Sequence, residues 1–429
     1  MKNTSHFAIY TGLMARSVVI LTLCGSLALA QTPSAPDSQS LTDTRSRVLL
    51  VDDDKSECPN AGFTEIQAAV NVAAPGDTIH VCPGTYAEQV EIAKPLRLVG
   101  IERNGKDAVV VQPSNVRINA EFSGFPYAAI ILVRDTSEVS LTNITIDGSN
   151  NGLVCDATSP TVDGVFFLNA SGEADAVAIR NILSPQACAF ADGIDIITTD
   201  ERAQRVTIRN SSLHDYDFVG IFALGSHLSV AVTNTVLTGR GPTELPDFGQ
   251  AGVQFIGGVT GAIEDNVVTN HITADPTNAF VAHGIGVFNV AAGEVRIVRN
   301  IVGTSNVGIF MIDSNKVVAQ DNTVVNALRT GIDAGGFVGG EANVVQDNTI
   351  TNVGFATPSD RDAARRGAIF VLGTNNRILH NTINEAFIGL VVTAGNHIGE
   401  NTFLNTRLTQ QVFVPPPSAD SSGASSNAR

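Results

Sequence analysis

Residues 308–322 read Gly-Ile-Phe-Met-Ile-Asp-Ser-Asn-Lys-Val-Val-Ala-Gln-Asp-Asn, a glycine, then mostly β-forming residues, then an asparagine fourteen positions after the glycine. Glycine and asparagine recur in this way seven times in the second half of the chain, at Gly220/Asn234, Gly252/Asn266, Gly286/Asn300, Gly308/Asn322, Gly331/Asn348, Gly367/Asn381 and Gly389/Asn401. Five of the pairs have the spacing of fourteen, the Gly331 pair is three residues longer, and the Gly389 pair is two shorter. A repeat period in the twenties is typical of a solenoid. The repeats lack helical periodicity, so each is predicted to form one rung of a parallel β-helix.

The bulk composition agrees with one elongated domain, predicted over residues 47–410, since a solenoid grows without domain boundaries. Of its 429 residues, 43% are hydrophobic and 16% are charged, and the net charge is −16. Removing a leader that contains Lys2 and Arg16 gives −16 − 2 = −18. An acidic protein repels phosphate backbones, so we expect no nucleic-acid partner. We expect a monomer.

The N-terminus resembles a cleavable export signal. Lys2 and Arg16 precede an apolar run that ends on Ala28-Leu29-Ala30, which predicts a signal peptide over residues 1–30 with cleavage after Ala30. The run is too short for stable membrane insertion. A lipid anchor on Cys24 is the alternative to a secreted or periplasmic protein. Residues 31–46 and 411–429 are predicted to be a disordered linker and a disordered tail.

Four cysteines remain after the leader: Cys58, Cys82, Cys155 and Cys188. An even number in an exported chain favours disulfides, and three pairings are possible. The pairs that close the shortest loops are Cys58–Cys82 and Cys155–Cys188. A cysteine metal site is the alternative, but the sequence lacks C-x-x-C spacing and clustered histidines.

A short helix is predicted over Phe63–Ala74, where Thr64 and Gln67 form a capping-box pattern. We expect it to cover the N-terminal end of the solenoid. The following segments are Pro75-Gly76-Asp77-Thr78, Val81-Cys82-Pro83-Gly84-Thr85-Tyr86 and Lys94-Pro95-Leu96-Arg97-Leu98-Val99-Gly100. This opening resembles that of the secreted right-handed parallel β-helix proteins of the pectin-lyase-like superfamily. The resemblance implies the fold and not a reaction, because the superfamily includes lyases, hydrolases, epimerases and proteins without known activity.

The seven repeated asparagines have a structural explanation. Asparagine tolerates the left-handed backbone conformation of a tight turn, and stacked amides can hydrogen-bond along a column. We therefore expect a buried asparagine ladder without a catalytic role.

Alignment of the rungs on their glycines predicts one outward-facing row, formed by Asp195, Phe222, Gln254, Phe288, Phe310, Asp333, Ile369 and Val391. We assign Phe222, Gln254, Phe288, Phe310 and Asp333 to substrate binding, since bare phenylalanines on an outer face suggest stacking against sugar rings. The alternative is that a long loop covers them, either Gly239–Gln250 or Ala274–Ala282.

Three acids near the start of this row, Asp192, Asp195 and Asp217, are the candidate catalytic residues, because paired carboxyls can supply an acid and a base. Here the chain partly resembles polygalacturonase-type glycoside hydrolases: Asp192 matches the first aspartate of their motif and Asp217 the last. Tyr216 stands at the middle aspartate, and the histidine and basic residues of the later motifs are absent. The departures favour neutral sugars, or binding alone, over pectate.

We assign no metal ligand and require no cofactor. Calcium held by the same acids is an open alternative. Arg202, Arg205 and Arg209 are expected to flank the acids, as a lyase would need. The sequence thus predicts an exported β-helix protein that binds or cleaves a polysaccharide or cell-surface glycan, as a hydrolase or a lyase if it is an enzyme. A non-enzymatic surface or periplasmic binding protein remains the alternative.

Overall fold

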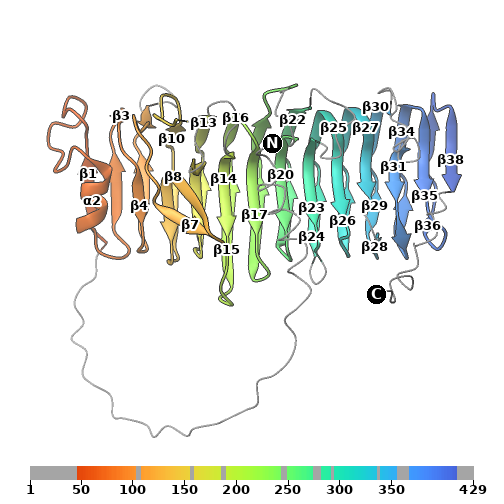
Figure 1. The fold of residues 1–429 in the computed structure, drawn as a ribbon, viewed down its shortest axis with the longest axis horizontal. Helices are drawn as coiled ribbons and strands as arrows, with labels where there is room; N and C mark the ends of the chain where they lie inside the picture. Colours follow the sequence, from red (N-terminus) through yellow and green to blue (C-terminus); the bar gives the residue numbers. More distant parts are fainter. Residues whose placement is uncertain are drawn as a thin grey trace, which may run out of the picture. The chain divides into compact units, whose positions relative to one another are not determined.

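The computed structural model describes residues 46–102, 108–154, 159–184, 190–242, 249–273, 282–290, 294–335, 339–354 and 367–412. From Ser46 onward the chain belongs to one compact unit. Its rungs stack side by side in sequence order along the long axis (Figure 1). The predicted all-β solenoid is confirmed. The predicted leader, most of the linker (31–45), Cys155, Cys188 and most of the tail (413–429) lie outside the described residues.

The first sheet has thirteen strands, each paired in parallel with the strand one rung away. Its strands are β1 (Val48–Val51), β2 (Thr78–Val81), β5 (Arg97–Gly100), β9 (Val139–Thr142), β12 (Gly172–Asp175), β15 (Gln204–Arg209), β18 (Leu228–Thr233), β21 (Thr260–Glu264), β24 (Val295–Val298), β26 (Val317–Gln320), β29 (Val344–Gln346), β33 (Arg377–Leu379) and β36 (His397–Ile398).

The second sheet begins at the next turn of each rung. Its strands are β3 (Gly84–Tyr86), β6 (Val109–Val111), β10 (Thr145–Asp147), β13 (Ala178–Ile182), β16 (Ser212–Tyr216), β19 (Val236–Thr238), β22 (Val267–His271), the first parts of β25 (Ile301–Ile312) and β27 (Thr323–Ala334), β30 (Thr349–Val353), β34 (Thr382–Ala386) and β37 (Thr402–Leu404).

The third sheet completes the rung, and the long strands β25 and β27 run through both it and the second sheet. Its strands are β4 (Val90–Ile92), β8 (Phe125–Arg134), β11 (Thr161–Leu168), β14 (Ala191–Ile197), β17 (Val219–Leu224), β20 (Ala251–Ile256), β23 (His283–Phe288), the second parts of β25 and β27, β31 (Gly367–Val371), β35 (Ile388–Val392) and β38 (Leu408–Val412). β7 (Ala120–Phe122) pairs antiparallel with β8, and β28 (Gly340–Glu341) pairs with β32 (Gly373–Thr374).

The inward side chains of the three sheets form one continuous apolar core. Within a single rung, Ile221, Val230 and Leu237 come from the third, first and second sheets, and each is 1% exposed or less. The same aliphatic types recur above and below, so each rung buries its apolar face against its neighbours and not by itself.

The recurrent glycine is explained by close approach between rungs. A Cβ added at Gly220 would lie 2.7 Å from the carbonyl oxygen of Gly252 on the next rung. A side chain there would push the rungs apart, so the repeat requires glycine for space and not for an unusual φ.

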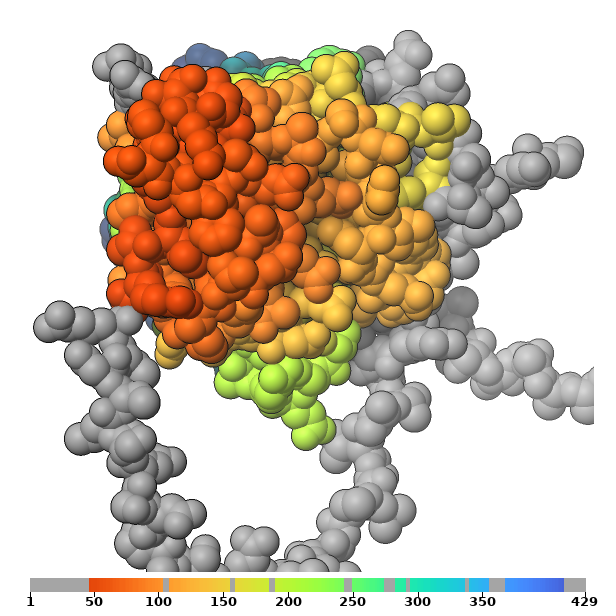
Figure 2. All heavy atoms as spheres, turned by 90° about the vertical axis from the view of Figure 1, so that its left-hand side faces the viewer, coloured from red at the N-terminus to blue at the C-terminus, as the bar shows by residue number. Residues whose placement is uncertain are grey.

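The helix α2 (Ile66–Val72) is shorter than the predicted Phe63–Ala74. It lies at the β1 end of the stack and buries Ile66, Ala69 and Val70 (Figure 1). From that end, the residues coloured red to orange form a continuous surface (Figure 2). The predicted capping box is wrong. The amides of Ile66 and Gln67 donate to the carboxylate of Glu88 at 2.7 and 2.8 Å, so a side chain from outside the helix satisfies them.

The predicted disulfide between Cys58 and Cys82 is present, with a Cα–Cα separation of 6.3 Å. It ties the loop after β1 to the end of β2, and Cys82 is fully buried. In the described part of the chain, no helix has the length and apolar character to cross a membrane.

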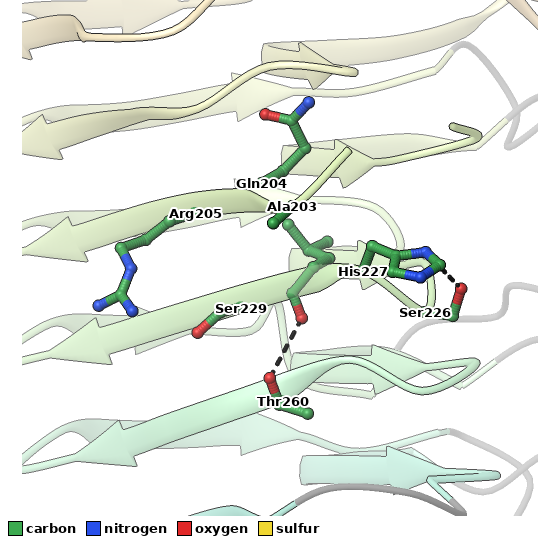
Figure 3. A pocket seen from close by; sticks show the side chains of 8 residues that line it. Ala203, Gln204, Arg205, Ser226, His227, Ser229 and Thr260 are labelled. Atoms are coloured by element: carbon green, nitrogen blue, oxygen red, sulfur yellow. Dashed lines mark hydrogen bonds between the residues drawn. The ribbon is translucent and has the colours of Figure 1, made fainter. Parts of the chain in front are cut away.

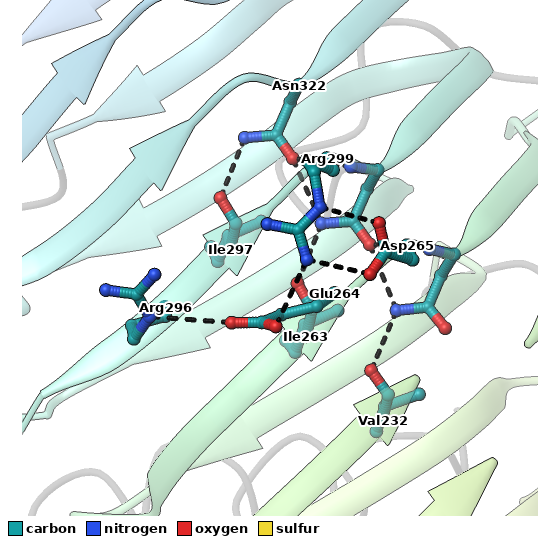
Figure 4. A network of polar contacts seen from close by, with 10 residues as sticks. Val232, Ile263, Glu264, Asp265, Arg296, Ile297, Arg299 and Asn322 are labelled. Atoms are coloured by element: carbon teal, nitrogen blue, oxygen red, sulfur yellow. Dashed lines mark hydrogen bonds and ion pairs between the residues drawn. The ribbon is translucent and has the colours of Figure 1, made fainter. Parts of the chain in front are cut away.

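The asparagine ladder is confirmed from Asn266 to Asn401, and Figure 4 shows part of it. In each step the Nδ2 of one asparagine donates to the Oδ1 of the next at 2.9–3.0 Å and also to a backbone carbonyl, such as that of Ile263 for Asn300. Asn234 is the exception: it is exposed, and Thr235 takes its place by donating its amide to Asn266 Oδ1.

The left-handed conformation falls on the residue before five of the six ladder asparagines, Asn401 being the exception, which corrects our expectation. Asp265, Arg299, Asp321, Asp347 and His380 have φ between 54° and 58°. These residues face solvent, where Arg299 pairs with Asp265 at 2.7 Å and with Glu264 at 3.4 Å (Figure 4). Exposed pairs contribute little to stability, so the buried amides hold this turn.

We predict that Asn300→Ala lowers the free energy of unfolding by about 3 kcal/mol, because it removes four hydrogen bonds and leaves buried groups unpaired. Urea denaturation followed by circular dichroism measures this change. The matched control is Asn71→Ala, at an exposed position of α2, which should stay within about 0.5 kcal/mol. Equal stability of the two variants would show that the ladder does not support the fold.

Candidate functional site

The outer face of the third sheet carries most of the predicted row. Asp195 pairs with Phe222, Phe222 with Gln254, and Phe310 with Asp333. None of these side chains belongs to the central core. Val391 is a sixth member, since it pairs with Phe370, the neighbour of Asp333, and also lies outside the central core. The sequence therefore predicted both the register and the outward face for these six residues.

Two members of the row were placed wrongly. Gly286 and not Phe288 lies between Gln254 and Phe310, and Phe370 and not Ile369 lies beside Asp333. Both errors arise because we aligned these two rungs on the wrong residue. Gly284 and Ala368 occupy the repeat position that we assigned to Gly286 and Gly367. Phe288 still points outward, two residues along the strand, whereas Ile369 is in the core.

Phe222 and Phe288 are not bare, as the stacking interpretation assumed. Phe222 is 9% exposed, Phe288 is 6% exposed, and Gln254 and Asp333 are buried as well. The row is thus a buried layer of polar and aromatic side chains outside the core. This agrees with the alternative interpretation, in which another segment of the chain covers the row. The two loops that we named for that role lie mostly outside the described residues.

An aromatic cluster occupies the middle of this face. The rings of His283, Phe288 and Phe310 meet edge to face, with centroids 5.4 to 5.9 Å apart. Phe288 lies over Gly286, whose missing side chain leaves room for the ring. Such geometry stabilises aromatic groups beyond the area that they bury, so these rings support one another.

Toward β11 lies a cluster of three carboxyls, here called the carboxyl cluster: Asp163 on β11 and Asp192 and Asp195 on β14. One ligand oxygen from each lies within 4.8 Å of the others. The three residues are 0%, 5% and 2% exposed. Asp192 Oδ1 accepts the amide of Val219 at 2.7 Å. Asp163 Oδ1 and Oδ2 and Asp195 Oδ1 are buried without a hydrogen-bond donor in the described structure.

Sequence reasoning missed Asp163. The signal was present, since Val162-Asp163-Gly164 repeats the pattern of Ala191-Asp192-Gly193 one rung away, and the two aspartates pair in register. Our alignment began at the later repeats and did not extend to β11.

The third predicted acid, Asp217, is held differently. Its Oδ2 accepts the amide of Ser184 at 2.7 Å, and its Oδ1 pairs with the guanidinium of Arg240. Gln250 donates to the carbonyls of Tyr216 and Asp217 at 2.9 and 3.3 Å and accepts the amide of Arg240. Asp217 is therefore fixed in a hydrogen-bonded corner beside the cluster.

Burial changes the acidity of all four acids. Loss of solvation raises the pKa of Asp192 to about 7, with a further contribution from Asp217. Burial, followed by the neighbouring carboxyls, raises the pKa of Asp163 and of Asp195 well above the ordinary value. The pKa of Asp217 is raised by burial, although Ser184 and Arg240 oppose the shift. Such groups can keep a proton near neutral pH or hold a cation when ionised.

The arginines that we expected beside the acids lie elsewhere. Arg205 and Arg209 belong to β15 on the first sheet and Arg202 directly precedes it, whereas the acids lie on the third sheet. Arg202 pairs with Asp200, and Arg209 pairs with Glu173 and Asp175. Because β14 and β15 follow each other around the rung, they belong to different sheets. Residues that are close in sequence on these two strands therefore lie on different faces.

Tyr216 lies in the core and not with the acids. Its hydroxyl lies 2.6 Å from His271 Nε2, and both side chains are fully buried. Burial, with a smaller effect of His283, lowers the pKa of His271 to about 3, so the imidazole is neutral at physiological pH.

A shallow pocket of about 380 Å³ lies on the outer face of the first sheet, among β15, β18 and β21 (Figure 3). Its lining residues are Ala203, Gln204, Arg205, Ser226, His227, Leu228, Ser229 and Thr260. No predicted catalytic or substrate-binding residue lines it. The pocket and the carboxyl cluster are therefore separate features.

The fold and register define a right-handed parallel β-helix. Among solved structures, the chain is similar to a GH136 lacto-N-biosidase from Eubacterium ramulus, with a TM-score of 0.57 and 11% identity over 83% of this chain and 67% of that chain. It is also similar to XylC in complex with xylose, with a TM-score of 0.51 and 10% identity over 84% of this chain and 86% of that chain. No protein-family model and no curated protein matches the sequence. At these identities the likeness establishes the fold alone.

We predict that Phe288→Ala lowers the free energy of unfolding by about 3 kcal/mol, because the ring is buried against His283 and Phe310. The control is Phe387→Ala, whose ring is 39% exposed and should cost under about 1 kcal/mol. Denaturant titration of both variants decides the matter. Full stability of Phe288→Ala would mean that the ring is free to contact a ligand, as the sequence alone suggested.

We predict that His271 reduces stability in acid. Its pKa is lower in the folded protein (about 3) than in the unfolded chain (about 6.5), so below pH 6.5 the unfolded chain binds the extra proton. Its contribution to stability is complete above pH 6.5 and is lost as the pH falls toward 3, at up to about 1.4 kcal/mol per pH unit. Urea midpoints at pH 7, 6, 5 and 4 measure the slope. The slope should be smaller in His271→Gln, and an unchanged slope would contradict the assignment.

Proposed function

We propose that this is an exported protein that binds or cleaves a polysaccharide or cell-surface glycan on the outer face of the third sheet. The observation that carries the proposal is the carboxyl cluster, a group of buried acids with raised pKa values on one outer face. Asp217 and the aromatic rings of Phe222, Phe288 and Phe310 lie on the same side of the rungs. Clustered acids with perturbed pKa values are typical of functional sites.

Two chemical states of the acids suit a sugar substrate. With protons retained, Asp192 can give a proton to a glycosidic oxygen, since its pKa lies near neutral pH. With a bound cation, the same oxygens can polarise the substrate. The oxygens of the carboxyl cluster are closer than the roughly 6.5–9.5 Å of an inverting pair, so inversion would use Asp217 as the second carboxyl.

The choice of a sugar rests on two further supports. A row with one position per rung, about 4.8 Å apart, suits a polymer that repeats along the same axis. The lacto-N-biosidase and the xylose complex show that this fold can serve carbohydrate-active proteins. A neutral glycan fits better than a polyanion, because the net charge is −16 and Arg240 is already paired with Asp217.

Export is part of the proposal. The leader over residues 1–30 would direct the chain out of the cytoplasm, with cleavage after Ala30. The Cys58–Cys82 disulfide supports an oxidising compartment.

A non-enzymatic role is the second candidate, and one observation favours it. The candidate catalytic acids Asp192, Asp195 and Asp217 are all 5% exposed or less, so a polymer can reach them only if this face opens. A protein that binds glycan without cleaving it would not need to bring the polymer to these acids.

We predict that the protein binds or cleaves one class of sugar in a panel of neutral polysaccharides. The panel is assayed with 1 mM calcium and with EDTA. Reducing-end assays measure hydrolysis of these sugars. Polyuronates, whose carboxyl group acidifies the proton that elimination removes, are added to the panel to test for a lyase. If the protein is an enzyme, Asp192→Ala should lower kcat by at least about 100-fold. The control is Asp215→Asn, at an exposed residue of β16, which should keep full activity.

Retention without any product would select the binding role. Failure of every glycan to bind or react would overturn the proposal. Equal loss of activity in Asp215→Asn would show that the effect of Asp192→Ala is not specific to the site.

A further inference from the structure

The carboxyl cluster poses an electrostatic problem that the described protein atoms do not solve. Asp163 is completely buried, neither of its oxygens has a hydrogen-bond donor, and Asp195 Oδ1 also lacks one. Burying an ionised carboxylate without a partner is strongly unfavourable, and neighbouring carboxylates add mutual repulsion. Each acid must therefore keep a proton or share a positive charge.

Among the described residues, no cationic side chain is paired with the cluster. Arg240 pairs with Asp217, while Arg202 and Arg209 pair with acids elsewhere. The backbone supplies one donor, the amide of Val219, which occupies Asp192 Oδ1. Three of the six carboxylate oxygens in the cluster therefore lack a donor among the described residues.

We propose that Asp163, Asp192 and Asp195 bind one divalent cation of the calcium type. The site consists of carboxylate oxygens, without the nitrogen or sulfur ligands that zinc and copper prefer. One carboxylate oxygen of Asp163 lies within 4.8 Å of an oxygen of each of the other two acids and gives the site its third ligand.

Calcium fits better than magnesium because magnesium keeps several waters when it binds a protein. The oxygen separations, all within 4.8 Å, accommodate either ion. A site with so little solvent exposure is poorly suited to a hydrated ion.

The ion would join β11 to β14, two neighbouring rungs, through side chains on the same row. This inference concerns the same acids as the proposed function but does not depend on it, because the ion would hold the rungs together even if no glycan is bound. Since the ion binds the folded chain, stability should rise with the logarithm of calcium concentration.

The test uses the full chain, treated with EDTA and dialysed into metal-free buffer at pH 7.5. Isothermal titration with calcium chloride should show one ion per chain at this site, with at least tenfold weaker binding of magnesium. The melting temperature should rise by about 3–5 °C at a calcium concentration one hundred times Kd. Asp163→Asn and Asp195→Asn should each weaken calcium binding at least tenfold.

A second measurement separates lost ligands from lost folding. In EDTA, Asp163→Asn should melt at or above the wild-type temperature, because it removes a buried acid that the metal-free protein accommodates poorly. The matched control is Asp54→Asn, in a second acidic group formed by Asp52, Asp53, Asp54 and Glu57. This control should leave calcium binding at the proposed site unchanged.

Three results would overturn the inference. They are no calcium binding up to 10 mM, binding that Asp163→Asn leaves unchanged, and binding that Asp54→Asn abolishes. A metal-free protein whose stability falls steadily above neutral pH, with no response to calcium, would show that the acids keep their protons instead. Failure of the glycan panel alone would leave the calcium site standing.

Discussion

Hydrogen bonding between rungs is the constraint on which the rest of this structure depends. Each strand donates and accepts along its length with the strand one rung away, in parallel and largely in register. Residues at the same position of successive rungs are therefore held about 4.8 Å apart. This spacing stacks like upon like, which suits aliphatic side chains and amides but disfavours acids of the same charge. The chemistry of each row therefore depends on whether identical side chains, stacked one above another, can satisfy each other's hydrogen bonds and charges.

Two rows show the contrast. In the asparagine ladder every amide is both donor and acceptor, so a stack of identical residues satisfies itself from Asn266 to Asn401. In the row that contains Asp163 and Asp192, two stacked carboxylates can only accept, so the same geometry leaves oxygens without donors. A stacked amide is thus a structural element, whereas a stacked buried acid calls for a proton or a cation. This difference is why we place function at β11 and β14 and not at the ladder.

The covered state of the third sheet limits what the acids can do. Their exposure of 5% or less keeps water away, which raises their pKa values and strengthens any interaction with a cation. It also restrains access by a polymer. A bound cation would fit the closed state, while glycan contact would require this face to open. Cation binding and glycan contact therefore require different states of the same residues. Experiments can separate them, because cation binding needs no substrate.

The sequence by itself determined the solenoid, the Cys58–Cys82 bond, most of the asparagine ladder and six positions of the outer row. These features depend mainly on the spacing of residues along the chain, which the sequence shows directly. Only the tertiary structure decided which glycine aligns with which, because Gly284 and Gly286 are equally good in sequence and differ in their neighbours on adjacent rungs. It also moved Arg205 and Arg209 to another sheet, buried Phe222 and Phe288, and brought Asp163 to Asp192 from 29 residues away. The physical reason is that exposure and charge pairing depend on what packs across and between rungs, which a repeat pattern does not encode.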